Sequence, residues 1–199
     1  MLAAAGPGCP SPDPRGPVPA RPAAPCVATI GGMPSVGTRA VEVVRQAGVA
    51  HILHEYELPE RAGRDRGLRP SYGLDTAAAL GVDPERLLKT LVVMVDGMPV
   101  LAMVPVASDA DLGALAAAVN GRRAEMADPA AAEKLTGYQV GGISPLGTRR
   151  RLPVVLDDSA VLYDTVLCSA GRRGLQLELT PGDLIRLTGA QLAEISRPR

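Results

Sequence analysis

Lys89 is the first residue whose type and position could support chemistry. Lys and Arg together number 21, yet only Lys89 and Lys134 are lysines. In a chain where arginine is the default cation, a lysine indicates a place that needs a compact point charge. Lys89 opens a strongly apolar run, so it could be a cation at the mouth of a pocket that binds a phosphate or an oxyanion. The alternative, favoured by the local pattern alone, is an edge lysine that limits aggregation.

The segment TGYQVGGISPLG, residues 136–147, is the second such feature. Gly141 and Gly142 permit positive φ angles and let another group approach the main chain closely. Ser144 and Pro145 then fix a turn. Successive exposed N–H groups in such a loop form a cradle for an anion or a carbonyl oxygen. The alternative is an ordinary glycine turn, and the loop by itself does not decide between the two.

Other kinds of chemistry find little support. His51 and His54 are three apart on a predicted strand, so their side chains point to opposite faces, which argues against a shared metal ion. Cys168 lies in an apolar strand with no histidine close in sequence, and this favours core filling over nucleophilic catalysis. The sequence contains no Walker loop, no GxGxxG motif and no GxSxG motif. We therefore predict neither a metal nor a cofactor.

Composition is that of an ordinary soluble globular protein, with 46% hydrophobic and 21% charged residues. Phe and Trp are absent, so aliphatic residues and Met must fill the core. The formal net charge is zero, so local clusters of arginine matter more than the charge of the whole molecule. Four clusters are candidate phosphate contacts, with solvated turns as the alternative: Arg122-Arg123, Arg149–Arg151, Arg172-Arg173 and the run Arg61, Arg64, Arg66 and Arg69. Three cysteines without a disulfide pattern and no membrane-length apolar run predict a cytoplasmic location without membrane association.

Residues 1–36 differ from the rest of the chain. They carry nine of the 19 prolines, a density that blocks both helices and sheets. We predict that 1–36 is a disordered tail rich in Pro, Ala and Gly, and that 37–199 is one folded domain. Because Met33 directly precedes the first periodic segment, we take Met33 as a candidate natural start in place of Met1.

From Thr38 onward, helix and strand signals alternate without the regular βαβ repeat of a doubly wound sheet. The pattern predicts an α+β domain with a mixed sheet. The expected helices cover 38–47, 75–81, a turn at 83–84, 109–120, 128–135 and a final region from 180. The expected strands cover 51–58, 89–95, 99–106, 151–157, 165–170 and 175–179.

Four strings of the sequence together resemble a known family. ERLLKTLVVMV, AEMADPAAAEKLTGYQVGGISPLG, RLPVVLD and SAGRRGLQLEL are similar, in order and spacing, to the YbaK/EbsC family of trans-editing deacylases. That family is related to the editing domain of prolyl-tRNA synthetase, and the likeness is strongest to its Cys-tRNA(Pro) deacylase branch. The resemblance covers roughly residues 38–196. It implies a YbaK-type editing fold, a mixed β-barrel-like sheet flanked by helices.

The resemblance also implies a function and a site. Family members hydrolyse the ester that joins a wrong amino acid to tRNA, here Cys-tRNA(Pro) and as a further substrate Cys-tRNA(Cys), with prolyl-tRNA synthetase as a partner. For a cysteinyl ester, the substrate's own thiol can assist. The residues that it marks as catalytic are Lys89, Gly141, Gly142 and Ser144. Those that it marks as substrate-binding are Tyr56, Tyr72, Ile143, Pro145, Ser169, Gly171, Arg172 and Gln176.

The sequence departs from the family pattern at three places. Gln176 stands where close relatives often carry aspartate, the segment between Tyr56 and Tyr72 is longer than in compact relatives, and the turn reads GRRG in place of GKRG. Two alternatives stay open at this point. One is a catalytically silent homologue that binds tRNA or the synthetase, and the other is a deacylase for another small amino acid, alanine or serine.

Overall fold

The computed structural model of the chain describes residues 37–57 and 72–199. The predicted disordered tail 1–36 lies outside these residues, as do Leu58 and the arginine-rich segment before Tyr72. The helices are α1 (Arg39–Gln46), α3 (Tyr72–Leu80), α4 (Leu112–Ala118), α5 (Pro129–Thr136), α6 (Pro181–Thr188) and the 3₁₀ helix η1 (Asp158–Leu162). The strands are β1 (Ile52–Glu55), β2 (Leu88–Val95), β3 (Met98–Pro105), β4 (Ser108–Ala110), β5 (Ala124–Met126), β6 (Val154–Asp157), β7 (Val166–Ser169), β8 (Leu175–Leu179), β9 (Gln191–Ala193) and β10 (Ser196–Pro198).

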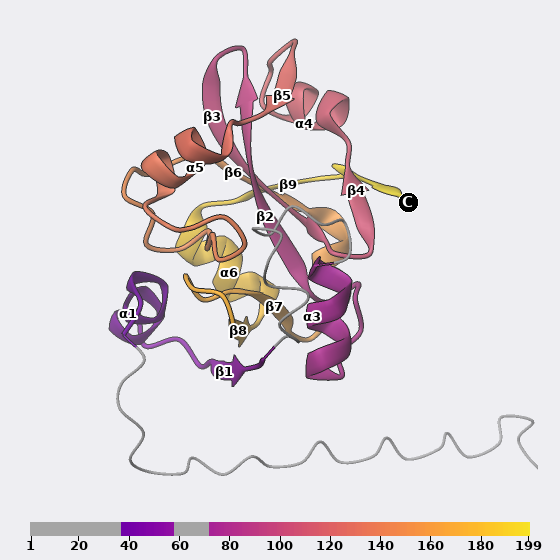
Figure 1. Cartoon of the computed structure of the whole chain (residues 1–199). Helices are drawn as coiled ribbons and strands as arrows, with labels where there is room; N and C mark the ends of the chain where they lie inside the picture. The colour runs from indigo at the N-terminus through magenta and orange to yellow at the C-terminus, as the bar shows by residue number, and fades with distance from the viewer. Residues whose placement is uncertain (1–36, 58–71) are drawn as a thin grey trace, which may run out of the picture. The chain divides into compact units, whose positions relative to one another are not determined.

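The β2–β3 hairpin is the centre of the main sheet (Figure 1). Its two-residue loop, Asp96-Gly97, has positive φ at both positions, as a tight hairpin turn requires. The sheet has the strand order β5-β2-β3-β6-β9. The pairs β3–β6 and β6–β9 are parallel, whereas β2 pairs antiparallel with both β3 and β5. The sheet is therefore mixed, as the sequence predicts.

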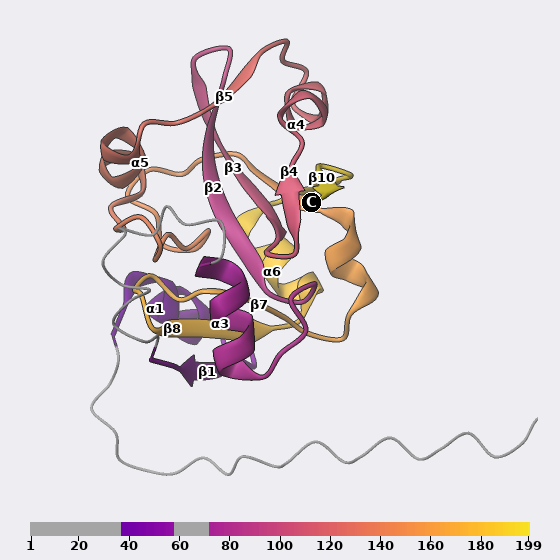
Figure 2. The ribbon, with the colours of Figure 1, turned by 45° about the vertical axis from the view of Figure 1, so that its right-hand side comes forward.

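Two smaller sheets complete the domain (Figure 2). Strands β1, β8 and β7 form an antiparallel sheet in which Gln176 faces His54 on one side and Ser169 on the other. Strands β4 and β10 form a two-stranded ribbon that joins the C-terminal end of the chain to the segment after β3. This ribbon brings residues about ninety positions apart in the sequence to the edge of the site described below.

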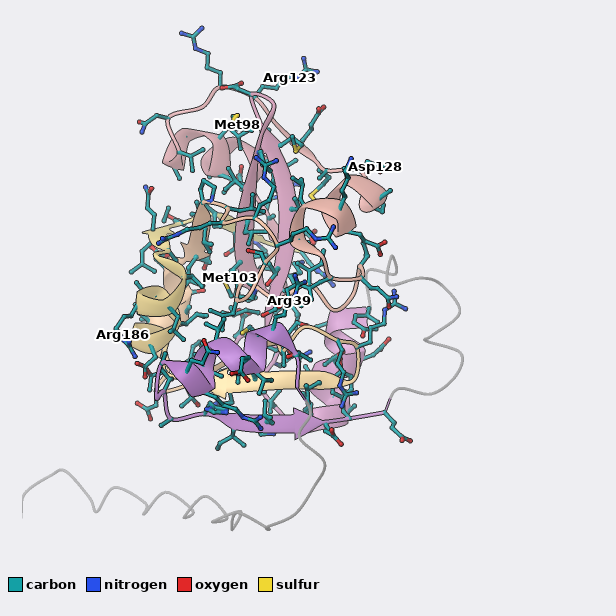
Figure 3. The ribbon with its side chains drawn as sticks, turned by 90° about the vertical axis from the view of Figure 1, so that its left-hand side faces the viewer. Arg39, Met98, Met103, Arg123, Asp128 and Arg186 are labelled. Atoms are coloured by element: carbon teal, nitrogen blue, oxygen red, sulfur yellow. The ribbon has the colours of Figure 1, made fainter. Side chains whose placement is uncertain are left out.

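The core lies on both faces of β3, whose side chains alternate between two clusters. Leu101 and Met103 pack toward the β7–β8 sheet, while Ala102 and Val104 pack toward α4. All four are fully buried, and burying a large aliphatic side chain stabilises a fold by about 1.5–3 kcal/mol. Figure 3 shows Met103 in the interior and Met98 at the far tip of the hairpin, where it is 69% exposed.

The predicted α+β class is confirmed. The described strands form three sheets, and these do not close into a barrel. Among the described residues, no helix has the length and apolarity to cross a membrane.

Several element boundaries differ from the sequence prediction. Helix α3 starts at Tyr72, not Asp75, and Asp83-Pro84 opens a turn that does not continue into a helix. The predicted helix from Asp109 begins only after Asp111, whose side chain caps it by accepting from the Ala114 amide. In α1 the buried face consists of Ala40, Val41 and Val44. The capped starts of α1, α5 and α6 at Thr38, Asp128 and Thr180 are confirmed.

Candidate active site

A cavity of about 420 Å³ lies between α3, the first half of β2, the loop after α5 and the facing ends of β7 and β8. Its walls are mostly apolar, with polar groups from a few side chains, which is the composition of a small-molecule site. Six of the residues that the sequence marks as functional line this cavity: Lys89, Gly141, Ile143, Tyr72, Ser169 and Gln176. The structure thus brings together Lys89 and the glycine loop, 52 residues apart in sequence.

Lys89 lies in β2, opposite Val104 of β3, with its side chain 23% exposed. Its ammonium Nζ donates to the carbonyl oxygen of Ser108 at 2.5 Å and lies 3.8 Å from Oδ1 of Asp109. Burial lowers the pKa of Lys89, as does the nearby positive charge of Arg199, while Asp109 acts in the opposite direction. Lys89 is therefore a partly desolvated cation at a cavity wall. Strand β3 pairs with β2 along its whole length, whereas β5 pairs only with Val93–Val95, so Lys89 lies on a part of β2 that β5 does not cover. Its burial and its contacts with Ser108 and Asp109 distinguish it from a solvent-exposed edge lysine.

Arg199 and Asp109 complete a charged cluster around Lys89. Nε of Arg199 lies 3.2 Å from Oδ1 of Asp109, the same oxygen that faces Lys89. Both residues line the cavity. The Asp109 carboxylate thus joins the two cations at this side of the cavity.

The glycine loop forms another part of the cavity lining, through Gly141 and Ile143. Gly141 has φ +88°, and Gly142 lies so close to the main chain of Arg172 that a Cβ there would meet it at 3.0 Å. Arg173 holds the loop from outside, because its Nε and Nη2 donate to the Val140 carbonyl oxygen at 3.0 and 2.6 Å. Both glycines are thus required by geometry, one for its backbone angle and the other for close packing.

Ser144, Gly142 and Pro145 do not line the cavity, although the sequence marks them as site residues. Ser144 is fully buried, and its Oγ accepts from the Leu146 amide at 3.2 Å. A buried hydroxyl that stabilises its own turn is not placed to meet a substrate in this conformation. The structure thus places the Ser144 hydroxyl in the turn itself and not on the cavity lining, and Gly142 and Pro145 also lie outside that lining.

The polar end of the cavity is built from α3, β1, β7 and β8. The hydroxyls of Tyr56 and Tyr72 are 3.4 Å apart, and Nε2 of Gln176 donates to the Tyr56 hydroxyl at 3.3 Å. Tyr56 itself is not a lining residue, so it acts on the cavity through Tyr72 and Gln176. Burial raises the pKa of Tyr72, and the neighbouring Tyr56 raises it further, so the phenol stays protonated at neutral pH.

Two buried oxygens on this cavity have no hydrogen-bond partner among the described residues, Oε1 of Gln176 and Oγ1 of Thr90. Gln176 is only 6% exposed. An unpaired buried polar atom costs about 1–3 kcal/mol, and such atoms mark places where a ligand group could complete the bonding. Ser169, next to Gln176, accepts the Gly171 amide on its Oγ at 3.3 Å.

Gly171 and Arg172 lie outside the cavity lining. The amide N–H of Gly171 donates the hydrogen bond to Ser169 Oγ that is described above. The Arg172 guanidinium instead forms an exposed ion pair with Glu55 at 2.8 Å. The structure thus does not bring Arg172 to the cavity, because the turn that carries it projects toward β1.

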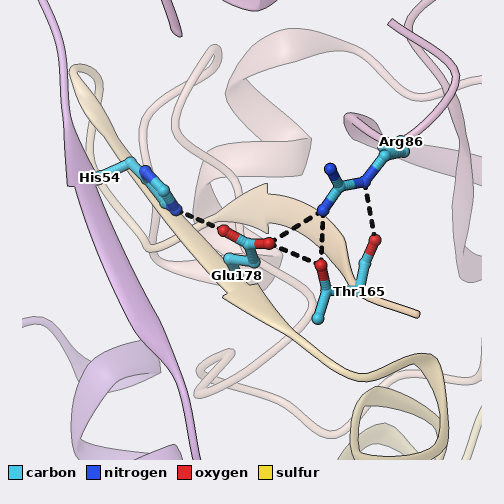
Figure 4. Close-up of polar contacts among 4 residues, drawn as sticks. All are labelled: His54, Arg86, Thr165 and Glu178. Carbon is cyan, nitrogen blue, oxygen red and sulfur yellow. Dashed lines mark hydrogen bonds and ion pairs between the residues drawn. The ribbon is translucent and has the colours of Figure 1, made fainter. Parts of the chain in front are cut away.

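A second polar network holds the segment that precedes Lys89 (Figure 4). Arg86 donates through Nη2 to Glu178 Oε1 at 2.9 Å and through Nε to the Thr165 carbonyl at 3.0 Å. His54 Nε2 lies 2.6 Å from Glu178 Oε2. Burial on its own would raise the pKa of Glu178, but hydrogen bonds from Thr165 and His54 and the nearby positive charges leave it below its ordinary value. This network fixes the entry into β2, three residues before Lys89.

The other candidate groups are not arranged for chemistry. His54 belongs to the network above, whereas Nδ1 of His51 lies 2.7 Å from the Val49 carbonyl oxygen. Cys168 is fully buried, and burial raises the pKa of its thiol to about 12. Within residues 37–57 and 72–199, no three acidic, histidine or cysteine side chains gather in a way that could hold a metal ion.

Sequence reasoning missed Asp109, Arg199 and Thr90 as cavity residues. The sequence around Asp109 indicated a helix cap instead of a cavity residue, because an aspartate before an alanine-rich run is typical of a helix cap. Arg199 carries no local signal at all. Thr90 could have been found, since it is the one hydroxyl residue in an otherwise apolar run, residues 90–95.

Comparison with known proteins places the chain in a family. The family model described as "Aminoacyl-tRNA editing domain" matches residues 71–187, which include Lys89, the glycine loop and Gln176. A protein of Enterococcus faecalis named "Putative Cys-tRNA(Pro)/Cys-tRNA(Cys) deacylase EbsC" is 39% identical over 121 residues, which cover 60% of this chain and 74% of that protein.

Two further comparisons agree with this assignment. The "Multifunctional Ser/Thr-tRNA deacylase ProXp-y" of Escherichia coli K12 is 32% identical over 49% of this chain and 59% of its own length. The crystal structure of a "putative trans-editing enzyme for prolyl tRNA synthetase" superposes with a TM-score of 0.65 and 26% identity, covering 80% of this chain and 95% of that one. With its motifs, its cavity and its fold in agreement, this chain belongs to the aminoacyl-tRNA editing domain family.

Proposed function

We propose that this protein is an aminoacyl-tRNA deacylase that removes cysteine from Cys-tRNA(Pro). The observation that carries the proposal is one cavity that is lined both by a partly buried lysine, Lys89, and by the glycine-loop residues Gly141 and Ile143. Its volume of about 420 Å³ suits a small aminoacyl group. The similarity to EbsC, whose name includes both Cys-tRNA(Pro) and Cys-tRNA(Cys), supports cysteine as the amino acid.

The reaction needs little from the protein, because an aminoacyl ester is already activated. Attack on the carbonyl carbon forms a tetrahedral oxyanion, and the bond to the ribose oxygen then breaks, releasing tRNA with a free terminal hydroxyl. The amides of Gly141 and Ile143 donate to no acceptor among the described residues, so they are available to an oxyanion. Lys89 lines the same cavity and contributes its positive charge either to the oxyanion or to the adjacent nucleotide phosphate.

The nucleophile comes from the substrate or from water. In a cysteinyl ester, the substrate sulfur can attack its own carbonyl carbon, closing a four-membered ring that water later opens. This route agrees with the protein's side chains, since Cys168 is fully buried and Ser144 faces its own turn. The site then supplies orientation and electrostatic stabilisation, which together can account for most of a rate enhancement.

A seryl or threonyl ester is the second candidate substrate. The unpaired oxygens of Gln176 and Thr90 favour a substrate that carries a hydrogen-bond donor. The similarity to a protein named as a Ser/Thr-tRNA deacylase agrees with this. Because a single group in a pocket discriminates by only about 1–3 kcal/mol, one site can accept both a thiol and a hydroxyl.

The test is a deacylation panel with Cys-, Ser-, Thr-, Ala- and Pro-tRNA(Pro), each with and without prolyl-tRNA synthetase. We expect Cys-tRNA(Pro) to lose its amino acid fastest and Pro-tRNA(Pro) to stay intact. We also expect the synthetase to increase the rate, since we propose that it presents the tRNA. Binding of tRNA with no cleavage of any ester would identify a silent homologue and remove the proposal.

A further inference from the structure

Strand β10 places a second cation, Arg199, next to Lys89. Strand β10 pairs with β4 so that Ser108 faces Pro198 and Asp109 faces Arg197. The next residue, Arg199, reaches the cavity wall and places its Nε 3.2 Å from Asp109 Oδ1. Lys89 approaches the same residue pair, through the Ser108 carbonyl and the Asp109 carboxylate.

The two cations repel each other across the carboxylate that they share. Asp109 is 52% exposed, so solvent screens its charge, whereas the side chains of Lys89 and Arg199 are only 23% and 29% exposed. Burial lowers the pKa of Lys89, and the positive charge of Arg199 lowers it further. The second effect is a direct result of this repulsion. An anion that binds between the two cations removes the repulsion, and so the cluster is suited to a negatively charged ligand.

The chemistry of the two cations indicates which anion fits. A guanidinium offers a planar set of donors that matches the oxygens of a phosphate, and an ammonium adds a compact point charge beside it. We propose that Arg199 is a phosphate-binding residue that, together with Lys89, holds a phosphodiester of the single-stranded 3′ end of the tRNA. The inference rests on the proposed function, because it assumes that the ligand is tRNA.

In this arrangement Asp109 is an internal counter-ion. With no tRNA bound, it holds Arg199 beside Lys89. Because it is half exposed, its carboxylate can turn toward solvent when a phosphate oxygen takes its place. The pairing of β10 with β4 keeps the backbone of Arg199 at the site meanwhile. The ribbon therefore positions the second cation, while α3 and the glycine loop enclose the ester.

The test compares Arg199→Ala with Arg197→Ala in the full-length chain. Arg197 lies two residues away on the same ribbon, is exposed and does not line the cavity, so it is a control of equal charge. Binding of uncharged tRNA(Pro) is measured between low and moderate salt, with tRNA that carries or lacks its 3′-terminal CCA. When one contact between a cation and a phosphate of single-stranded RNA is lost, the slope of the logarithm of the binding constant against the logarithm of the salt concentration becomes smaller by about 0.7.

We expect Arg199→Ala to weaken binding of intact tRNA about tenfold at low salt and to reduce the salt slope by about 0.7. Arg199→Lys should restore the slope, and the loss should disappear with tRNA that lacks CCA. Equal losses for Arg197→Ala, or for both forms of tRNA, would overturn the inference, as would no loss for Arg199→Ala.

Deacylation of Cys-tRNA(Pro) by the wild-type protein is measured in parallel and separates the two claims. If the wild type deacylates and Arg199→Ala binds tRNA normally, only the role of Arg199 is wrong. If the wild type neither binds tRNA nor cleaves any ester, the proposed function itself fails, and the inference fails with it.

Discussion

The guanidinium of Arg39 lies over the ring of Tyr138, with Cζ 4.6 Å from the ring centroid. Its Nη2 also donates to the carbonyl oxygens of Thr136 and Gly137, at 3.2 and 2.8 Å. The Tyr138 hydroxyl in turn donates to the Leu146 carbonyl at 2.8 Å. Helix α1 thus holds the start of the glycine loop, and Tyr138 joins that start to its end.

This relationship gives the first prediction. Arg39→Ala should lower the free energy of unfolding by only about 1 kcal/mol, since the contact is partly exposed. It should lower kcat/KM for deacylation about tenfold, because the loop loses its fixed position. Arg45→Ala, on the exposed side of the same helix, is the control and should change neither value. Normal activity in Arg39→Ala would show that the loop keeps its geometry without α1.

Cys168 provides the second prediction. Burial raises the pKa of its thiol to about 12, so almost no thiolate exists at neutral pH and the thiol is a poor nucleophile. Cys168→Ala should therefore deacylate Cys-tRNA(Pro) within about twofold of the wild-type rate, with a modest loss of stability from the small cavity. A complete loss of activity in a variant with an unchanged circular dichroism spectrum would mean that the protein, not the substrate or water, supplies the nucleophile.

The third prediction concerns Glu178 and acid stability. Because the pKa of Glu178 lies below its ordinary value of 4.5 in the folded protein, its contribution to stability is fully present above about pH 4.5. That contribution is lost as the pH falls through the lower, folded-state pKa. Glu178→Gln should lower the free energy of unfolding at neutral pH by about 2 kcal/mol, since it leaves Arg86 without its charged partner.

Denaturant titrations of Glu178→Gln and the wild type at several pH values test this. The difference between them should shrink below pH 4.5. Glu55→Gln is the matched control, because its ion pair with Arg172 is about half exposed and should contribute less than about 0.5 kcal/mol. A constant difference at all pH values would assign the loss in Glu178→Gln to packing and not to charge.

How far the sequence predicts this fold depends on the range of the interactions. Local signals located the helix starts at Asp128 and Thr180, because cap preferences act within four residues. Strands β4, β9 and β10 were not predicted. Each is three residues long and exists only through pairing with a distant partner, so no local pattern marks it.

The functional site likewise has residues that the sequence could indicate and residues that only the three-dimensional structure brings together. The resemblance located Lys89 and the glycine loop, and the structure places both on one cavity. It could not indicate which loop residues face that cavity, so Ser144 was expected to contact substrate although its hydroxyl faces its own turn. Arg199 was missed because only the β4–β10 ribbon brings it to Lys89, across 90 residues of sequence from Asp109.

Asp109 gives the fourth prediction. Asp109→Asn removes the negative charge between Lys89 and Arg199 but keeps an oxygen that Arg199 can contact. Binding of tRNA(Pro) should become several-fold tighter at low salt, because no carboxylate competes with the phosphate. Asp75→Asn, which removes an exposed charge outside the cavity lining, is the control. Weaker binding in Asp109→Asn alone would mean that the carboxylate is needed to position the cations and is not displaced.

The central claim is that the Lys89 cavity is where the ester is cleaved. The most direct measurement is single-turnover deacylation of Cys-tRNA(Pro) by the wild type, Lys89→Ala and Lys134→Ala, with folding checked by thermal unfolding. Lys134 is the only other lysine, and it is exposed on α5 away from the cavity lining. We predict that Lys89→Ala loses at least about a hundredfold in rate while staying folded, and that Lys134→Ala keeps the wild-type rate. A folded Lys89→Ala variant with the wild-type rate would contradict the account.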